Sequence, residues 1–154
     1  MLLRPYQVSD AEILAAIYRD AVTGIGASAY DAQQIAVWSL YPEDIEEFRQ
    51  LLGCGLTLVA VENSRAVAFG QLNPPDRLAY LYTASNFARL GYGTAIYQRL
   101  EAYAREQGIK RLHTEASRIS KHLFLKMGFC IVERELAVRH GVEFERFKME
   151  KVIG

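Results

Sequence analysis

The chain has 154 residues, of which 51% are hydrophobic, so we expect one domain, residues 1–154, around a single core, and the composition excludes a disordered chain. Its 18 basic and 18 acidic residues give a net charge of zero, which argues against nucleic acid as a partner. The two cysteines are isolated and no apolar run approaches the roughly 20 residues of a membrane span, so we expect a cytoplasmic protein with no disulfide framework, no metal site and no membrane partner.

The N-terminal segment predicts a strand followed by a helix. Leu2 to Tyr6 has the composition of a short strand, and Pro5 confines it to a sheet edge. Ser9 or Asp10 is expected to cap the helix, with Glu12 completing a capping box from Ser9. The apolar positions of this helix follow the i, i+3, i+4 rule: Ile13, Leu14, Ile17, Tyr18 and Ala21.

Two short helices and a hairpin come next. Gly24-Ile25-Gly26 is expected to break the first helix as a flexible connection, because it follows a helix and lacks the third glycine of a phosphate loop. The helices are predicted near Asp31 to Trp38 and Pro42 to Leu52, the second opening with proline in its first turn. Strands over Leu56 to Glu62 and Ala66 to Leu72 are rich in Val, Leu and Phe and indicate a hairpin.

The second half alternates strands and helices. The predicted elements are strand Leu78–Thr83, helix Thr94–Gln107, strand Leu112–Ala116, helix Ile119–Met127, and a closing hairpin of Phe129–Val138 and Glu143–Val152. The fold class is therefore α+β, with a mixed, mostly antiparallel sheet covered by helices.

The loop before the helix at Thr94 contains Gly91 and Gly93 one residue apart, directly after a strand. Glycine permits backbone conformations closed to other residues and lets a ligand approach closely. The free N–H groups at the start of the following helix, with the positive end of its dipole, suit a phosphate or pyrophosphate. The sequence therefore predicts a cofactor that carries phosphate.

Two motifs at fixed spacing extend this prediction. The first is Leu81-Tyr82-Thr83 followed by Ala88-Arg89-Leu90-Gly91-Tyr92-Gly93, and the second runs from Ser117 through Phe124 to Gly128-Phe129. With the order of the elements, they make the whole chain resemble the GNAT superfamily of N-acetyltransferases. The resemblance implies strands splayed apart at the cofactor site and transfer of acetyl from acetyl-CoA to a primary amine of a small molecule or peptide.

The same resemblance implies the cofactor contacts. The pantetheine arm would pair with the backbone at Leu81 and Thr83, and an N–H near Tyr82 would face the thioester oxygen. Ser117, Ser120 and Phe124 would lie on the face that meets the cofactor. The pyrophosphate would sit on backbone N–H groups of the glycine loop, namely Arg89, Leu90, Gly91, Tyr92, Gly93 and Thr94.

Four positions depart from the family pattern, one of them Ser117, which stands in place of the usual Asn and keeps a hydroxyl that can hydrogen-bond the pantetheine. Ala88 replaces the usual Arg or Gln, Phe124 stands where many members carry a tyrosine acid, and Arg77 occupies the position of a glutamate base. We therefore take the catalytic candidates from chemistry: Glu115 and Tyr82 near the splay. A structural role is about as plausible for Glu115 and somewhat more plausible for Tyr82.

The acceptor site is expected along the segment that follows the first helix. Tyr30, Gln34 and Trp38 are the substrate-binding candidates, although Trp38 is on base rates more often a core residue. The acidic positions at 43–47 are read either as a solvated helix start or as an attraction for a cationic amine. Either a monomer or a homodimer is compatible with the sequence, Phe144 and Phe147 offering a dimer surface.

Two other functions stay open. A non-catalytic acyl-CoA-binding or regulatory domain is motivated by Phe124 and Arg77. A dinucleotide-binding oxidoreductase is disfavoured, because the loop at Gly91 and Gly93 lacks a third glycine and no Rossmann alternation precedes it.

Overall fold

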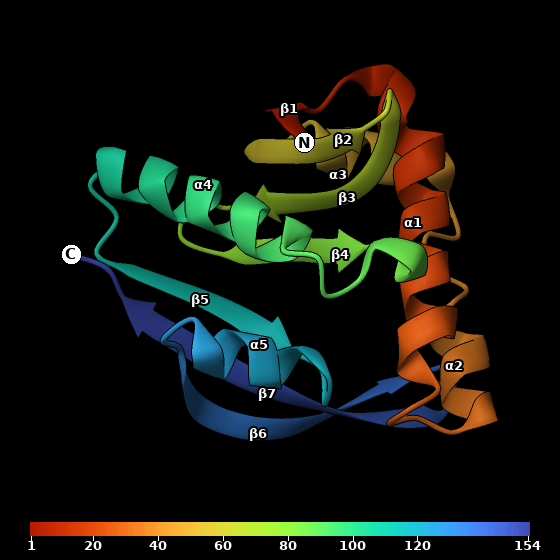
Figure 1. Ribbon diagram of the computed structural model, residues 1–154. Coiled ribbons are helices and arrows are strands. Elements are labelled where there is room, and N and C mark those ends of the chain that lie inside the picture. The colour runs from red at the N-terminus through yellow and green to blue at the C-terminus, as the bar shows by residue number, and fades with distance from the viewer.

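The computed structural model describes residues 1–154, apart from the side chain of Ile25. Figure 1 shows helices packed on both sides of a sheet that separates into two parts. A 3₁₀ turn lies at Val8–Asp10 and another at Ser85–Phe87. The elements in chain order are β1 (Leu2–Pro5), α1 (Ala11–Gly26), α2 (Ala32–Trp38), α3 (Ile45–Leu52), β2 (Leu56–Glu62), β3 (Arg65–Leu72), β4 (Leu78–Thr83), α4 (Tyr92–Glu106), β5 (Arg111–Ala116), α5 (Ser120–Lys126), β6 (Cys130–Arg139) and β7 (Val142–Val152).

The sheet has two antiparallel parts, with strand orders β1-β2-β3-β4 and β5-β7-β6. They are joined by one parallel bridge between Arg77 and His113. The α+β class and both hairpins are as predicted. In the first hairpin, Asn63 and Ser64 adopt φ of 50° and 64°, values typical of the tight turns that join twisted antiparallel strands.

The core lies on both faces of the first sheet. Leu81 packs among residues of the α4 side, whereas Tyr80 and Tyr82 pack among residues of the α1 and α3 side, as the alternation of a strand requires. On α4 the predicted stripe holds, since Ile96, Leu100 and Ala104 are buried. A Cβ at Gly70 would lie 2.7 Å from Cγ2 of Ile96, so this glycine lets α4 approach β3 closely.

The start of α1 differs from the prediction. Asp10, not Ser9, accepts a hydrogen bond from the backbone N–H of Gln7 (2.8 Å) and is held by Arg4 at 2.7 and 2.8 Å. Glu12 turns outward to Arg49. Ile13 is exposed and lies outside the buried stripe of α1, contrary to the prediction.

The end of α1 also differs, since the helix continues through the Gly24 to Gly26 segment that was expected to break it. Both glycines permit close packing. A Cβ at Gly24 would lie 2.7 Å from Cβ of Ser85, and one at Gly26 would lie 3.1 Å from Cδ1 of Ile35. Glycine marks a close approach here rather than the end of a helix.

The third helix begins later than predicted. Its N-cap is Asp44, whose side chain accepts from the N–H groups of Glu46 and Glu47. Pro42 lies before the helix, after a cis peptide bond, and not in its first turn. The acidic cluster therefore includes the residue that caps α3.

Two further observations concern partners. Phe147 is buried, and Phe144 is half-buried and packs against Tyr30 at a ring-centroid distance of 6.3 Å, so of the two rings only that of Phe144 is partly exposed. Among the described residues, no helix combines the length and the apolar composition needed to cross a membrane.

Candidate active site

The site begins where β4 and β5 separate. The strands meet at the Arg77–His113 bridge, and Oγ1 of Thr114 donates to the carbonyl of Leu78 (2.8 Å). Beyond this point they diverge toward α1 (Figure 1). A cleft of about 1020 Å³ lies between them, lined by β4, β5, the start of α4 and of α5, and the region around α2.

The direction of the β4 backbone follows from its hydrogen bonds. The N–H of Ala84 donates to the carbonyl of Val67 (2.9 Å), and Tyr82 pairs with Phe69. Backbone groups alternate sides along a strand, so Leu81 and Thr83 direct theirs away from β3 and into the cleft. The N–H groups nearest Tyr82 that face the cleft are therefore those of its two neighbours.

The glycine loop presents a second set of donors. Arg89 and Gly91 adopt φ of 63° and 91°, and Gly91 is the left-handed N-cap of α4. Among the described residues, no acceptor binds the backbone N–H groups from Leu90 to Thr94; the first bond of the helix runs from Ala95 to Gly91 (3.0 Å). Five of the six predicted loop residues line the cleft, namely Arg89, Gly91, Tyr92, Gly93 and Thr94, while the Leu90 side chain points out to solvent.

The opposite wall is formed by the start of α5. The N–H of Ser117 donates to Oγ of Ser120 (2.9 Å), and the N–H of Ser120 donates to Oγ of Ser117 (3.0 Å). Phe124 is buried and stacks edge-to-face on Phe129 at 5.3 Å. Ser117, Ser120 and Phe124 all line the cleft as predicted, and none of them has the phenol hydroxyl that would act as a general acid.

The two catalytic candidates lie on opposite strands of the splay. Oε2 of Glu115 accepts from Nε of Arg77 (3.1 Å), so Arg77 pairs with the carboxylate. The ring of Tyr82 lies 4.7 Å from that of Tyr18, edge-to-face. Burial raises the pKa of Tyr82 to about 12, which keeps its hydroxyl neutral at physiological pH.

The acceptor end of the cleft is aromatic. Tyr30 is buried, accepts from the backbone N–H of Arg118 (2.9 Å), and stacks on Trp38 with centroids 5.0 Å apart. Tyr30 and Trp38 line the cleft as predicted, but Gln34 does not. Gln34 belongs to the cap of α2, where its N–H donates to Asp31 (2.7 Å), and its Nε2 donates to the carbonyl of Glu143 (2.9 Å).

Several residues of this end were not predicted as site residues from the sequence, namely Tyr18, Tyr80, Arg139 and Phe144. The hydroxyls of Tyr41 and Tyr80 are hydrogen-bonded to each other. The alternation of Tyr80 and Tyr82 along β4 was the available signal, because it places both rings on one face of the strand. Nothing in the sequence indicated that the tip of the β6–β7 hairpin reaches the cleft.

A mostly antiparallel sheet, split between β4 and β5 with a glycine loop at one end of the split, is the arrangement that the resemblance to the N-acetyltransferases implied. Residues 24–129 match the family model described as Acetyltransferase (GNAT) family, and the chain belongs to this family. It is therefore a member of a family of acetyltransferase enzymes.

The similar proteins cover nearly the whole chain. An uncharacterised N-acetyltransferase of Escherichia coli, YafP, is 27% identical over 147 residues, which are 96% of this chain and 93% of that protein. A GCN5-related N-acetyltransferase structure from Rhodopseudomonas palustris has a TM-score of 0.95 and 28% identity over 99% of this chain and 95% of its own. PaiA N-acetyltransferase from Thermoplasma acidophilum, solved with coenzyme A, has a TM-score of 0.80 and 18% identity, with coverage of 99% and 98%.

Proposed function

We propose that this chain, acting as one domain over residues 1–154, transfers an acetyl group from acetyl-CoA to a primary amine of a small molecule or peptide by direct attack on the thioester. The observation that carries the proposal is the cleft between β4 and β5, with backbone groups of Leu81 and Thr83 along one wall and unpaired N–H groups at the start of α4. PaiA was solved with coenzyme A, and YncA of Salmonella typhimurium, at 20% identity, with acetyl-CoA.

The residues of the loop and of β4 have separate roles in this proposal. The N–H groups from Leu90 to Thr94 and the dipole of α4 bind the pyrophosphate, and Arg89 adds charge. Leu81 and Thr83 pair with the pantetheine arm as an added strand would. Acetyl-CoA supplies an activated acyl group, and a cleft-facing N–H donates to the thioester oxygen as negative charge develops there.

In this proposal no tyrosine on α5 protonates the leaving sulfur. Phe124 offers no proton, so the coenzyme A sulfur leaves as the thiolate. The attacking amine forms the new C–N bond as the C–S bond breaks, and it releases one proton. Glu115 is the proposed acceptor of that proton, directly or through one water, and the neutral hydroxyl of Tyr82 is proposed to orient the amine.

The test is an acetyl-transfer assay. Thiol release from acetyl-CoA is followed with a panel of primary amines, and each product is checked by mass spectrometry for the added acetyl group. We expect release that depends on both enzyme and amine. A protein that binds acetyl-CoA but turns over none of a broad amine panel would instead be the non-catalytic acyl-CoA-binding domain.

A further inference from the structure

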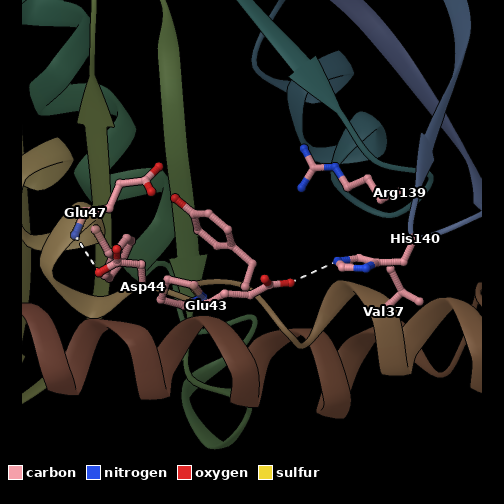
Figure 2. A pocket seen from close by; sticks show the side chains of 9 residues that line it. Val37, Glu43, Asp44, Glu47, Arg139 and His140 are labelled. Carbon is pink, nitrogen blue, oxygen red and sulfur yellow. Dashed lines mark hydrogen bonds and ion pairs between the residues drawn. The ribbon is translucent and has the colours of Figure 1, made fainter.

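One cationic side chain at the acceptor end of the cleft has no carboxylate partner. Arg139, the last residue of β6, lines both the main cleft and a smaller adjoining pocket of about 470 Å³. In the described part of the chain it forms no ion pair. Figure 2 shows its guanidinium pointing into the adjoining pocket, away from the hairpin strand.

Three other arginines of this region each have a carboxylate partner. Arg77 pairs with Glu115 (3.1 Å), Arg118 with Glu145 (3.3 Å), and Arg146 with Glu135. The pairing leaves Arg139 as the cation available to a ligand there. Arg89, the other cleft arginine without an ion pair among the described residues, lies in the glycine loop at the opposite end.

On the side of the main cleft Arg139 lies among aromatic residues, whereas Glu43, Asp44 and Glu47 line the adjoining pocket with it. Burial raises the pKa of the hydroxyls of Tyr18, Tyr41 and Tyr82, against the opposing effect of the Arg139 guanidinium. These hydroxyls stay neutral, so no phenolate satisfies the guanidinium. Tyr18 and Tyr41 lie edge-to-face at 5.1 Å and form an apolar wall beside it.

We propose that the acceptor is an amine that also carries a carboxylate, bound by Arg139, with an apolar or aromatic body against the tyrosine rings. This inference rests on the proposed function and names its substrate class: an α-amino acid or a related amino carboxylate. A guanidinium matches a carboxylate with two parallel hydrogen bonds, and the partly enclosed cleft strengthens such a pair. The carboxylate end then lies near the hairpin, which directs the amine toward Tyr82 and Glu115.

A cationic acceptor is the competing reading, because Glu43, Asp44 and Glu47 line the adjoining pocket. Two of these carboxylates already have partners. Glu43 binds Nε2 of His140 (2.9 Å, Figure 2), and Asp44 caps α3. None of the three lines the main cleft, and the two carboxylates that do, Glu115 and Glu145, are paired with arginines, so the charge left for an acceptor there is that of Arg139.

The experiment measures binding before turnover. Phenylalanine, leucine and methionine are each compared with the decarboxylated amine, by calorimetry on the enzyme saturated with coenzyme A. Putrescine serves as the cationic probe. We expect each amino acid to bind about 10- to 100-fold more tightly than its decarboxylated amine, and more tightly than putrescine.

The variants are Arg139→Gln, Arg139→Lys and, as a control with the same charge change, Arg99→Gln on the exposed side of α4. We expect the preference for the carboxylate to disappear in Arg139→Gln, to be reduced in Arg139→Lys, and to persist in Arg99→Gln. Equal binding of acid and amine by the unaltered enzyme, a preference that survives Arg139→Gln, or tighter binding of putrescine would each overturn the proposal.

Turnover then separates the two proposals. Equal acetylation of amines with and without a carboxylate would support the acetyltransferase activity and reject carboxylate binding by Arg139. A preference for carboxylates that depends on Arg139, in an enzyme that acetylates nothing, would support the carboxylate site and reject the transferase.

Discussion

Replacing Gly93 with alanine should change stability and cofactor affinity in opposite directions. Gly93 lies in the first turn of α4, and a Cβ there would lie 3.7 Å from Oγ1 of Thr83, which is ordinary van der Waals contact. Alanine is a better helix former than glycine by up to about 1 kcal/mol in a helix interior and by less near an end. We therefore expect Gly93→Ala to stabilise the fold by about 0.5 kcal/mol and to raise Tm by about 1–2 °C.

The same methyl group would stand on the cleft wall, between the unpaired N–H groups of α4 and the end of β4. A phosphate held by those groups needs close backbone approach, so we expect acetyl-CoA to bind about 10- to 100-fold more weakly, a loss of roughly 1.4–2.7 kcal/mol. Calorimetry measures the affinity, and thermal unfolding without ligand measures the stability.

Gly108→Ala is the matched control at the other end of α4. Gly108 has φ of 79° with open space around its Cβ position, and it lies outside the cleft. We expect this variant to lose about 1 kcal/mol of stability, because of the left-handed backbone, without any change in affinity. If Gly93→Ala bound acetyl-CoA as tightly as the unaltered chain, the phosphate could not lie against the start of α4.

Three further predictions concern other parts of the molecule. Asp10→Asn should cost about 2 kcal/mol, since Asp10 is 6% exposed and makes two bonds to Arg4. Its hydrogen bonds to Arg4 hold the pKa of Asp10 below its usual value. The stability that Asp10 contributes is therefore present above about pH 4 and is lost as the pH falls through its folded-state pKa. In urea titrations, the difference in unfolding free energy between the unaltered chain and Asp10→Asn should become smaller over that pH range. Glu115→Gln should lower kcat/KM about 100-fold, and Arg77→Gln should lower it less; full kcat/KM in Glu115→Gln across the pH range would remove Glu115 as the base. Tyr82→Phe should lower kcat about 10-fold by the same amount from pH 6 to 9, because the pKa of Tyr82 is about 12, and a loss confined to one limb of the profile would contradict this role.

The elements that sequence alone predicted well are those fixed by local chemistry. The alternation and turn residues of the β2–β3 hairpin and the glycine spacing before α4 are local signals, and the structure places both where they were expected. At Gly24 a local rule failed, because its meaning depends on Ser85, a residue 61 positions away that packs against it.

The site divides in the same way. The proposed cofactor-binding wall, formed by β4 and the start of α4, could be predicted because it depends on the backbone direction of a strand and on the start of a helix. The acceptor end was not, since it is assembled by contacts between segments far apart in the chain. The bond from Gln34 to Glu143 made Gln34 a structural residue, and the hairpin turn brought Arg139 to the cleft. The ion pair between Arg77 and Glu115 could not be predicted either, because the two residues lie 38 positions apart in the chain.

The most direct test of the account is thermal unfolding of the purified protein with acetyl-CoA, with NAD and ATP as controls. A ligand at about 100 times its Kd adds about 2.7 kcal/mol of stability. For a chain of 154 residues this corresponds to a rise in Tm of about 5–10 °C. We predict that rise with acetyl-CoA and not with NAD or ATP; no rise at saturating acetyl-CoA would contradict the assignment of the β4–β5 cleft as its binding site.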